Sequence, residues 1–422
     1  MEQTLKTAVS RFFLAPPYSL YHFCLAFLSA LYFGFPSRRL IVVGVTGTKG
    51  KSSTIEFANA AFEAAGYTTA LASTIRTKIA SQSKANTRRM TMPGRFFLQD
   101  FLKCAIDAKC AVAFIEMTSE GARQHRHRFI ALDALVFTNL APEHIESHGS
   151  YEAYANAKFS LGKALVSSSK RPRIIIANAD DRESARYLTL PVEHAIPFSP
   201  SAFDARANEG GGTFRMDDTN ITIHLPGTFS LQNAIAAALL ARAFDIRTDA
   251  IRLGFDALKK IPGRAERIHE GQPFLVVVDY AHTPDSLSAL YDTYPNRKKI
   301  CVLGATGGGR DHWKRPVMGS IASASCEHVI LTNEDPYDES PDAIIKNIAA
   351  GMKKQPEIIL DRRAAIARAL SLANNTGKEC AVLITGKGTD PTIEGPRGNS
   401  TTWSDAEVTR EELKKMVYNK SV

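Results

Sequence analysis

The sequence predicts an α/β protein with two mostly parallel sheets, and three observations support this. Short apolar segments alternate with helical patterns almost throughout the chain, which is typical of parallel strands joined by crossover helices. The length of 422 residues is more than one hydrophobic core normally covers. A glycine-rich turn separates an apolar run from a helical pattern near residue 50. We therefore expect two or three domains.

The first alternation occupies about the first half of the chain. Five apolar runs predict buried strands, at 40–45, 68–73, 110–117, 132–140 and 173–180. The run EGGGTFRMDDTNITIHL, at 209–225, is rich in turn residues and predicts a small antiparallel hairpin. An alanine-rich helix is predicted to follow, over 230–244.

A second alternation begins after the break Ile261-Pro262-Gly263. Its predicted strands are FLVVVDY, KKICVLGA, EHVILTN and CAVLITG. We place the domain boundary at this break, because proline and glycine interrupt both helices and strands. The predicted parts are an apolar helical segment over 1–39, a central domain over 40–262 and a Rossmann-like C-terminal domain over 263–422.

The N-terminal segment Tyr18 to Phe35 contains 18 residues and no Asp, Glu, Lys or Arg. Basic residues stand on both sides of it, among them Arg38 and Arg39. The segment is at the lower length limit for a membrane span, and a predicted strand follows it closely. We expect a helix that packs on the protein or lies at a membrane surface, and a true span is the less favoured interpretation.

Charge and cysteine content narrow the class of protein. The net charge of +9 comes from scattered basic residues with no arginine-rich block, so it fits an anionic substrate and gives no specific sign of nucleic acid. Six widely spaced cysteines include no C-x-x-C pair. We expect reduced, mostly buried thiols in a cytosolic protein.

The glycine-rich turn reads GVTGTKGKSS, from Gly44 to Ser53. Such a turn points backbone N–H groups and a helix N-terminus at one place, which favours a phosphate. Lys51 is expected to reach the β- and γ-phosphates of a nucleotide, and Ser52 to offer its hydroxyl to Mg²⁺. The strict P-loop pattern requires a glycine where this chain has Val45, so only the GKS part matches. The alternative is a glycine-rich turn with a solvated lysine.

Polar clusters end or follow other predicted strands, where open α/β sheets bind their ligands. Glu116 ends one strand and is followed by Thr118, Ser119 and Glu120. A carboxylate at that place could hold Mg²⁺, which prefers oxygen ligands. Asn139 to His144 end another strand, and Tyr154 to Lys158 lie on a predicted helix. Taken singly, each cluster also has a structural explanation.

The order of the motifs is more specific than any one of them. The chain contains GVTGTKGKSS, IEMTSEG, FTNLAPEHIESHGSYEAYANAK, NADD, LPGTFSLQNAIAAA, PGRAER, VDYAHTPDSL, GATGGGRDHWKRPVMG, TNEDPYDESP and ITGKGTD in that order. This series closely resembles the Mur ligase family, and within it the branch that adds the third amino acid to a UDP-N-acetylmuramoyl dipeptide. The resemblance runs from about Val42 to the C-terminal region, and it accounts for the irregular P-loop.

The resemblance implies an ATP-dependent ligase in the cytoplasm. A substrate carboxylate attacks the γ-phosphate of ATP to give an acyl phosphate, and an amine converts this to an amide. Lys51 and the loop match the phosphate cradle, and the metal ligands match Ser52, Glu116 and His144. Lys158 matches a lysine that the family carries as a carbamate, an anion able to face Mg²⁺. The cradle is expected to comprise Gly47, Thr48, Lys49, Gly50, Lys51, Ser52 and Ser53.

Four further residues match family contacts to the nucleotide. Asn233 resembles the residue that contacts adenine, and Asp279 the acid that binds the ribose. Arg264, in PGRAER, resembles an arginine that contacts the nucleotide from the C-terminal domain. His282 is expected to approach the phosphates, with a structural histidine as the alternative. Contacts from two domains imply closure over ATP, which excludes water from the acyl phosphate.

The sequence departs from the family pattern in its N-terminal region. Only about 40 residues precede the first predicted strand, so the family's usual N-terminal UDP-binding domain is expected to be lacking. Either UDP binding is much reduced, or the glycan substrate is presented differently, for example on a lipid. A helix at the membrane surface suits the second option.

Two motifs that contact the amino acid also differ. Enzymes of the family that add meso-diaminopimelate carry Asp-Asn-Pro-Arg, whose arginine binds the distal carboxylate. This chain has Glu334, Asp335, Pro336 and Tyr337, which favours an amine-ended side chain such as lysine or ornithine over diaminopimelate. The alternative is that these acids cap the following helix. The family motif GKGHE here becomes Gly386 to Asp390, and Asp390 is expected to hold the incoming amine. Thr118 and Ser119 are expected to contact the glycopeptide.

Two other functions remain open at this point. The chain could be a related ligase for a folate, a poly-amino acid or a lipid-linked glycan. It could also be a P-loop ATPase, a GTPase or a nucleotide-binding protein without ligase activity. The sequence contains no N-K-x-D guanine motif, and Lys51, Glu116, His144 and Lys158 are all present, which favours a ligase.

Overall fold

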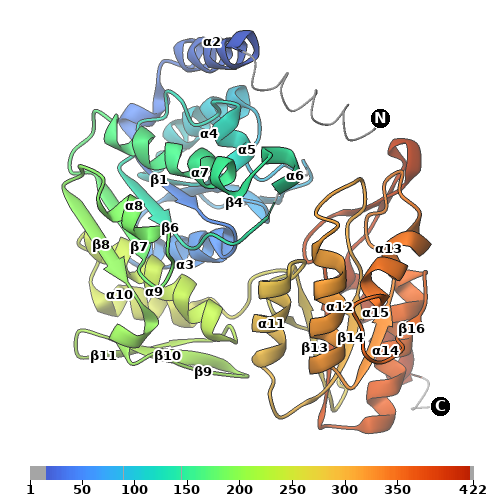
Figure 1. Cartoon of the computed structure of the whole chain (residues 1–422). Helices are drawn as coiled ribbons and strands as arrows, with labels where there is room; N and C mark the ends of the chain where they lie inside the picture. The colour runs from blue at the N-terminus through green and yellow to red at the C-terminus, as the bar shows by residue number, and fades with distance from the viewer. Residues whose placement is uncertain (1–15, 89, 144, 419–422) are drawn as a thin grey trace. The chain divides into compact units, whose positions relative to one another are not determined.

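The computed structural model describes residues 16–88, 90–143 and 145–418 (Figure 1). The chain divides into two compact units. The first unit contains the residues up to Arg206 together with Gly212–His224 and Phe229–Lys259. The second contains Ala207–Gly211, Leu225–Thr228 and everything from Lys260 onward. The predicted boundary at residue 262 therefore lies close to the start of the second unit's main part.

The first unit is built on an eight-stranded sheet of order β4-β3-β2-β5-β1-β6-β7-β8. The six strands from β2 to β8 in this order pair in parallel, and β3 and β4 add an antiparallel edge. The central strands are buried along their whole length, which is why they read as continuous apolar runs. The strands are β1 (Ile41–Thr46), β2 (Thr69–Ala72), β3 (Arg76–Ile79), β4 (Gln82–Ala85), β5 (Val112–Glu116), β6 (Ala134–Phe137), β7 (Ile174–Asn178) and β8 (His194–Phe198).

Helices pack against both this sheet and one another. A large core lies between the sheet and helices α4 and α7, and it contains Leu102, Ile115 and Phe137. The helices of this unit are α3 (Lys51–Ala64), α4 (Arg95–Asp107), α5 (Ser119–Arg123), α6 (Ile145–His148), α7 (Tyr151–Val166), α8 (Ser184–Leu188), α9 (Thr228–Ala243) and α10 (Thr248–Ala257). A small sheet of order β11-β10-β9 contains β9 (Arg206–Asn208), β10 (Gly211–Met216) and β11 (Thr219–Ile223). The predicted hairpin is confirmed by the antiparallel pair β10 and β11.

The apolar N-terminal segment forms helix α2 (Pro16–Tyr32), and a 3₁₀ turn, η1 (Pro36–Arg39), follows it. Helix α2 packs on α4, and the Ser29 hydroxyl donates a hydrogen bond to the Arg95 carbonyl oxygen at 3.1 Å. Among the described residues, no helix combines the length and apolar character needed to cross a bilayer. Of the two expected arrangements, packing on the protein is confirmed by these contacts, and a position at a membrane surface stays a prediction.

The second unit contains a six-stranded sheet of order β12-β13-β17-β14-β15-β16. The strands from β13 to β16 pair in parallel, and their core includes Val276, Val302, Val382 and Ile366. The strands are β12 (Glu266–Arg267), β13 (Leu275–Asp279), β14 (Lys298–Leu303), β15 (His328–Leu331), β16 (Glu357–Ile358) and β17 (Cys380–Thr385), with a separate hairpin of β18 (Thr392–Glu394) and β19 (Ser400–Thr402). The helices are α11 (Pro284–Asp292), α12 (Lys314–Ser325), α13 (Pro341–Ala349), α14 (Arg362–Thr376) and α15 (Asp405–Tyr418).

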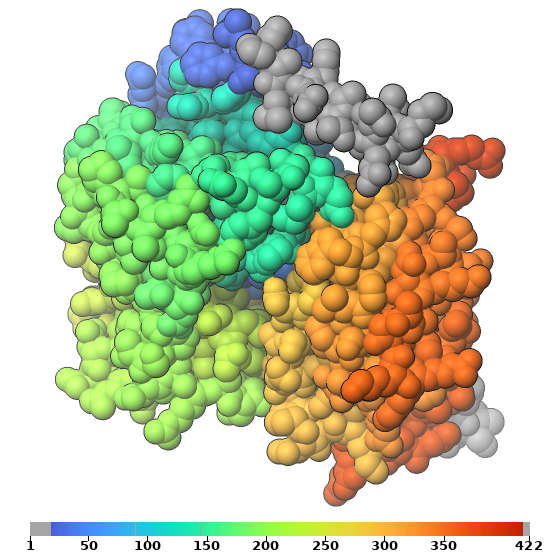
Figure 2. Space-filling model, viewed as in Figure 1, coloured from blue at the N-terminus to red at the C-terminus, as the bar shows by residue number. Residues whose placement is uncertain are grey.

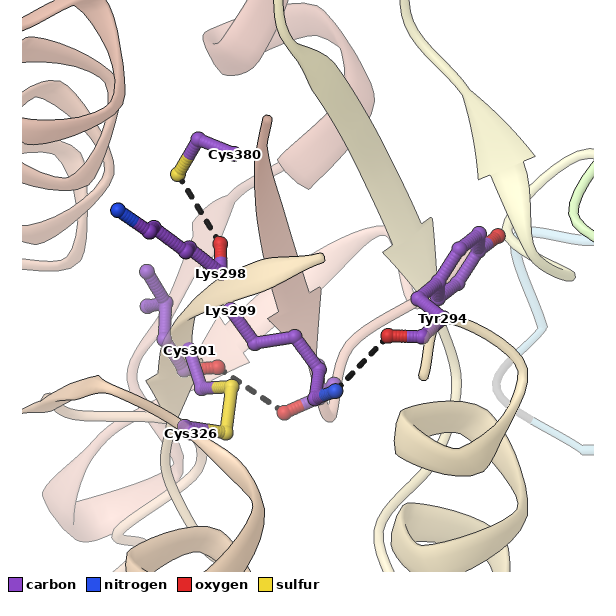
Figure 3. The surroundings of a disulfide bond; sticks show 8 residues. Tyr294, Lys298, Lys299, Cys301, Cys326 and Cys380 are labelled. Carbon is purple, nitrogen blue, oxygen red and sulfur yellow. Dashed lines mark hydrogen bonds between the residues drawn. A yellow bond between two sulfur atoms is a disulfide. The ribbon is translucent and has the colours of Figure 1, made fainter. Parts of the chain in front are cut away.

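The expectation that all cysteines are reduced is wrong for one pair. Cys301 and Cys326 form a disulfide, with their Cα atoms 6.2 Å apart (Figure 3). Cys301 lies on β14, and Cys326 is the C-cap residue that follows α12 and precedes β15. The parallel pairing of β14 with β15 brings the two cysteines together across 25 residues of sequence. Of the other cysteines, Cys24 and Cys104 are exposed, whereas Cys110 and Cys380 are buried. The cysteine pattern alone therefore no longer supports a reducing compartment.

Candidate active site

The glycine-rich turn connects β1 to α3, as predicted, and its backbone requires glycine at two positions. Gly47 has φ of 145° and Gly50 has φ of 85°, and side chains rarely tolerate these values. A Cβ atom on Gly47 would lie 2.0 Å from the Thr138 hydroxyl, and one on Gly50 would lie 2.2 Å from Oδ1 of Asn233. The turn therefore runs close against β6 and α9.

The residues that follow β6 hold this turn in place. The Thr48 amide donates to the Asn139 carbonyl at 2.8 Å, and the Lys49 amide donates to Oδ1 of Asn139 at 2.9 Å. The Thr48 hydroxyl lies 3.0 Å from the Tyr154 hydroxyl on α7. The Lys49 ammonium forms an ion pair with Glu143 at 3.0 Å. The turn is thus fixed before any ligand binds.

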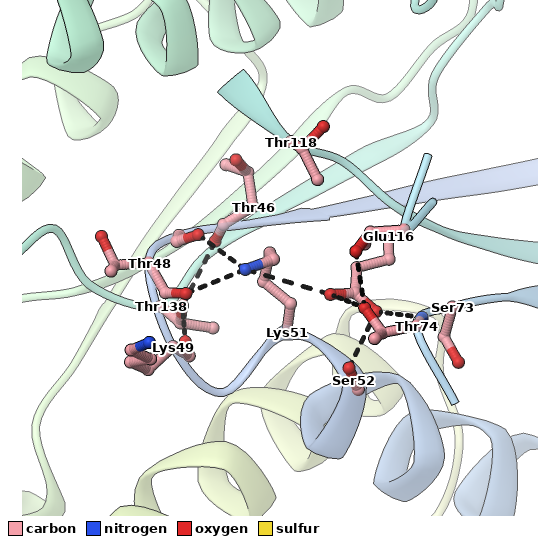
Figure 4. Close-up of polar contacts among 12 residues, drawn as sticks. Thr46, Thr48, Lys49, Lys51, Ser52, Ser73, Thr74, Glu116, Thr118 and Thr138 are labelled. Atoms are coloured by element: carbon pink, nitrogen blue, oxygen red, sulfur yellow. Dashed lines mark hydrogen bonds and ion pairs between the residues drawn. The ribbon is translucent and has the colours of Figure 1, made fainter. Parts of the chain in front are cut away.

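Lys51, Ser52 and Glu116 converge beside the turn (Figure 4). The Lys51 ammonium donates to the carbonyl oxygens of Gly47 and Thr48 at 3.0 and 2.9 Å, and it lies 3.9 Å from Glu116. The Ser52 hydroxyl donates to Oε2 of Glu116 at 2.8 Å. The carboxylate of Glu116 is 2% exposed and already faces a cation, so its oxygen atoms suit a divalent ion.

Thr74 is a residue of this cluster that the sequence did not suggest. Its amide and hydroxyl donate to the two oxygens of Glu116, at 2.8 and 3.1 Å. Thr74 lies two residues after the end of β2, and β2 pairs in parallel with β5, which ends at Glu116. The sequence shows only that a polar residue follows the run TTALAS. It does not show that β2 and β5 are neighbours in the sheet, so the contact with Glu116 could not be predicted.

Lys158 reaches the same turn from α7. Its ammonium donates to the Gly47 carbonyl at 2.7 Å, and the side chain is buried. Burial holds the pKa of Lys158 well below its usual value, and the nearby Lys51 lowers it further. The predicted site residues Gly47, Lys51, Ser52, Glu116 and Lys158 therefore lie together.

The other predicted residues of the first unit lie around this cluster. Asn233, on α9, accepts a hydrogen bond from the Thr54 hydroxyl at 3.4 Å, and Ser53 is buried in α3. Thr118 caps α5 by accepting from the Gly121 amide at 3.1 Å. The Ser119 hydroxyl lies 3.1 Å from Nε2 of His148. His144 lies outside the described residues.

In the second unit, the predicted nucleotide residues gather where β13 ends. Asp279 accepts hydrogen bonds from the amides of Ala265 and Ala281, at 2.6 and 2.7 Å. The Arg264 guanidinium lies 4.5 Å from the centre of the Tyr280 ring, and Nδ1 of His282 lies 2.6 Å from the Tyr280 carbonyl oxygen. The PGRAER and DYAH motifs, which are separated in sequence, thus form one local structure.

Strands β15 and β17, which lie on either side of β14, carry the predicted amino-acid residues beyond their carboxyl ends. Asp335 forms a buried ion pair with Lys387, with both oxygens 2.7 Å from Nζ. Glu334 is fully buried against Gly386, and its Oε1 accepts from the Thr306 hydroxyl at 2.9 Å. Burial raises the pKa of Glu334, and the nearby Asp335 adds to the effect. Burial also raises the pKa of Asp390.

Basic residues compensate part of the negative charge of the acidic run from Glu334 to Glu339, which the sequence of the run did not suggest. Lys387 compensates Asp335, and Glu339 pairs with the buried Arg315 at 2.5 Å. Tyr337 lies under the guanidinium of Arg310, which is 5.2 Å from the ring centre, so a cation is present beside the motif. Two of these acids have partners other than the N-terminus of α13, since Glu339 pairs with Arg315 and Asp338 accepts from the Arg397 amide at 2.7 Å.

The site combines a phosphate-binding turn with oxygen ligands for a metal. In the described part of the chain, no group of three or more His, Cys, Asp or Glu residues could hold a metal ion. The Ser52 hydroxyl and the Glu116 carboxylate still fit Mg²⁺, which commonly takes only one or two carboxylates plus phosphate oxygens. Together with the parallel sheets, this defines a P-loop nucleotide-binding protein followed by a Rossmann-like unit.

Comparison with known proteins gives the family. Residues 45–241 match the model of the Mur ligase middle domain, and residues 263–388 match that of the Mur ligase, glutamate ligase domain. A UDP-N-acetylmuramyl-tripeptide synthetase of Roseiflexus sp. (strain RS-1) is 36% identical over 402 residues, covering 87% of this chain and 78% of the relative.

Two solved structures are also similar. A UDP-N-acetylmuramoyl-L-alanyl-D-glutamate–2,6-diaminopimelate ligase is 26% identical with a TM-score of 0.60, over 90% of this chain and 79% of that one. Folylpolyglutamate synthase of Mycobacterium tuberculosis, complexed with ADP, has a TM-score of 0.67 at 18% identity, over 93% of each chain, and shares the fold. The chain belongs to the Mur ligase family, and it is therefore an ATP-dependent ligase.

Proposed function

We propose that this chain adds an amino acid to a UDP-N-acetylmuramoyl peptide, as a step in the synthesis of peptidoglycan precursors in the cytoplasm. The observation that carries the proposal is the convergence of Lys51, Ser52, Glu116 and Lys158 on the turn at Gly47. The name of the Roseiflexus relative supports the same substrate class. The four residues come from three elements, so their meeting depends on the fold and not on one local motif.

In this proposal the turn binds the phosphates of ATP through its backbone N–H groups. Lys51, which now donates to two carbonyl oxygens of the turn, exchanges one of them for a phosphate oxygen. Ser52, Glu116 and, from the sequence, His144 hold Mg²⁺. The ion supplies charge neutralisation at the phosphoryl group that is transferred.

The substrate carboxylate attacks the γ-phosphorus, and the bond from phosphorus to the bridging oxygen of ADP breaks. The resulting acyl phosphate is attacked by an uncharged amine, and phosphate leaves as the amide forms. Thr118 and Ser119 begin the segment after β5 and contact the glycopeptide in this proposal. The chain's own contribution is to hold the reacting atoms in line and to neutralise charge.

Lys158 is proposed to act as a carbamate. An uncharged amine reacts with carbon dioxide, and the lowered pKa of Lys158 favours the uncharged amine. A bond forms between the lysine nitrogen and the carbon of carbon dioxide, one proton is released to solvent, and the product is an anion beside Lys51, where a second cationic side chain is electrostatically unfavourable. As a carbamate, the buried Lys158 would contribute a negative charge at the metal site. Its hydrogen bond to the Gly47 carbonyl does not provide this charge.

The remaining residues are assigned to the nucleotide and the amino acid. Asn233 is proposed to contact adenine, Asp279 the ribose, and Arg264 and His282 the phosphates. Asp390 and Glu334 are proposed to bind the two amines of an incoming diamino acid such as lysine or ornithine. The Arg310 guanidinium near Tyr337 instead favours diaminopimelate, because it could bind the distal carboxylate of that amino acid.

The experiment measures phosphate release from ATP by the purified protein. UDP-N-acetylmuramoyl dipeptide is supplied with lysine, ornithine or meso-diaminopimelate in turn. Release that requires both the dipeptide and one amino acid supports the proposal and identifies the added residue. No release with any of the three contradicts it and favours a related ligase with another acceptor, such as a lipid-linked glycan.

A further inference from the structure

Helix α2 has two faces with different surroundings. The inner face packs on α4 and the segment after α5, and its buried residues are His22, Ala26, Ser29 and Ala30. Polar contacts fix it there, since the Ser19 hydroxyl lies 2.8 Å from Nε2 of His125 and Nδ1 of His22 lies 2.5 Å from the Arg95 guanidinium. The orientation of the helix on the first unit is therefore defined.

The outer face of α2 is apolar and exposed. Leu28 is 52% exposed, Leu31 is 54% exposed and Tyr32 is 79% exposed. A helix that is apolar on all sides is normally buried on all sides. Figure 2 shows atoms of α2, in dark blue, at the surface of the first unit. The outer face, as used below, comprises Leu20, Tyr21, Phe27, Leu28, Leu31 and Tyr32.

Aromatic rings extend this apolar surface beyond α2. Phe129, after α5, packs against Phe23 and Phe27 with ring centres 5.2 and 5.3 Å apart. Phe35 continues the row from Phe27 at 6.4 Å. On another side, Phe33 contacts the exposed Phe96 of α4 at 6.5 Å. The apolar surface is therefore continuous over three segments of the first unit.

The charged residues next to this surface are mostly basic, although the exposed Glu120 lies close enough to Tyr18 to add to the effect of burial in raising the pKa of that side chain. Residues 16–39 include no Asp or Glu, and Arg38 and Arg39 are exposed directly after α2. The Arg38 guanidinium lies 4.5 Å from the centre of the Phe35 ring, so it borders the aromatic row. Arg128, next to Phe129, is exposed as well. An apolar face with a basic border complements a surface that is apolar inside and anionic outside.

We propose that the outer face of α2 lies on an anionic lipid bilayer and holds the first unit at the membrane surface. The helix lies flat there, because its inner face is packed on the protein and its 17 residues span only about 26 Å. Tyr21, Tyr32 and the phenylalanines have the amphipathic or aromatic character found at bilayer interfaces. A second copy of the chain fits less well, since it would bring Arg38, Arg39 and Arg128 against their own equivalents.

This inference does not rest on the proposed reaction, because it concerns a surface outside the site. The ligase could fail its assay and the surface could still bind lipid. The two proposals are therefore tested by separate measurements: phosphate release for the reaction, and association with vesicles for the surface.

The first experiment is flotation of the full chain with vesicles of phosphatidylcholine, with or without phosphatidylglycerol. The wild type is expected to float with the anionic vesicles, and less so at high salt. The double variant Leu28→Glu/Leu31→Glu is expected to lose about tenfold or more of its partitioning. The matched control is Leu253→Glu/Ile358→Glu, whose residues are 55% and 54% exposed elsewhere in the chain, and it is expected to float like the wild type.

A second measurement needs no substitution. Cys24, on α2, and Cys104, on α4, are both exposed thiols. Anionic vesicles are expected to slow maleimide labelling of Cys24 about tenfold and to leave the labelling of Cys104 unchanged. This comparison remains informative even where the double variant folds poorly.

Four results would overturn the inference. The wild type could fail to float with either vesicle type, or the α2 double variant could float as well as the control. Sedimentation could also show a dimer of the wild type that the double variant abolishes, in which case a second copy covers the outer face. Equal protection of Cys24 and Cys104 would likewise contradict a contact through α2.

Discussion

The Lys158 side-chain nitrogen lies 2.7 Å from the carbonyl oxygen of Gly47, in the turn that the sequence predicts as the phosphate cradle. Lys158 is almost fully buried, and burial together with Lys51 depresses its pKa well below the usual value. A buried lysine of this kind favours the uncharged amine, which is the form that accepts carbon dioxide. The contact links α7 directly to the loop between β1 and α3.

Replacing Lys158 by alanine is expected to lower kcat by about a hundredfold or more, because the site would lose the proposed carbamate, an anion that would support the proposed metal site. Short carboxylic acids such as acetate are expected to restore part of the activity, since they can place a carboxylate in the space that the side chain leaves. Phosphate release with the substrates of the proposed reaction measures both effects.

The matched control is Lys163→Ala, since Lys163 lies on the same helix α7 and is exposed. It is expected to keep full activity with and without acetate. Full activity of Lys158→Ala would exclude a carbamate at this position, and an equal loss in both variants would indicate damage to the helix.

The depressed pKa of Lys158 also predicts a pH dependence of stability. Between that pKa and the ordinary value of 10.5, the unfolded chain binds a proton that the folded chain does not. The free energy of unfolding therefore rises with pH across this window. Lys158→Met removes the effect and is expected to raise the Tm by about 2–4 °C at neutral pH, which corresponds to about 1 kcal/mol.

Thermal unfolding in buffers free of carbon dioxide measures this difference from neutral pH to about pH 9. The difference in Tm between Lys158→Met and the wild type is expected to become smaller as the pH rises. A difference that stays constant or grows would show that Lys158 does not titrate in the window.

Gly50 predicts a different kind of defect. It has φ of 85°, and a Cβ atom would lie 2.2 Å from Oδ1 of Asn233. Gly66 has φ of 88°, but nothing lies within 4 Å of its Cβ position. Both alanine variants carry backbone strain of about 1–2 kcal/mol, and only Gly50→Ala must also displace Asn233. We expect ADP affinity to fall at least about tenfold in Gly50→Ala and to stay unchanged in Gly66→Ala.

Calorimetric titration with ADP measures both affinities, and thermal unfolding separates affinity from stability. An ADP affinity that stays at the wild-type value in both variants would contradict a nucleotide site at this turn. If both variants lost the same amount of ADP affinity, the loss would come from backbone strain alone and not from the displacement of Asn233.

Whether a strand could be predicted from the sequence depends on how deeply that strand is buried. The strands β1, β5, β6 and β7 are buried along almost their whole length, so they appear as apolar runs and were predicted. The antiparallel strands β3 and β4 at one side of the sheet were missed, because the residues RTKI and QSKA are mostly polar and β4 is fully exposed. A two-residue strand such as β12 leaves no periodic pattern at all.

The site residues divide in the same way. The turn at Gly47 to Ser52 is a local motif and was recognised. Thr74 contacts Glu116 only because β2 pairs with β5, and Lys387 reaches Asp335 only because β17 and β15 both flank β14. These contacts depend on the order of strands in a sheet, which the sequence does not state. The positions of Asn233, Arg264, Asp279 and His282 on a bound nucleotide stay predictions.

The buried pair of Lys387 and Asp335 is expected to be important for stability. Lys387→Met leaves the Asp335 charge buried without a cation, which costs about 3–5 kcal/mol. The double variant Asp335→Asn/Lys387→Met is expected to recover most of this loss, because the amide oxygen can still accept from the Glu394 amide, now at 2.8 Å.

Urea unfolding midpoints measure the stability of these variants. Arg363→Met is the control, since its exposed pairs with Glu411 and Glu412 are expected to contribute less than about 1 kcal/mol. Failure of the double variant to recover stability would mean that Lys387 acts through packing and not through its charge.

Glu334 is expected to decide which amino acid is used. Its side chain is buried at the carboxyl end of β15, and Oε2 has no hydrogen-bond partner among the described residues. Such an acceptor fits an incoming ammonium group, which would satisfy it. Glu334→Gln is expected to lower kcat/KM for lysine or ornithine about tenfold or more and to affect diaminopimelate less.

Asp338→Asn is the matched control, because Asp338 lies in the same loop, is exposed and bonds to the Arg397 amide at 2.7 Å. The raised pKa of Glu334 adds a second test. Preference for the amine-ended substrate is expected to strengthen as the pH rises through that pKa, since only the ionised carboxylate attracts an ammonium group. Equal kcat/KM for lysine and diaminopimelate in the wild type would contradict this selection, and would favour Arg310 as the group that meets the end of the side chain.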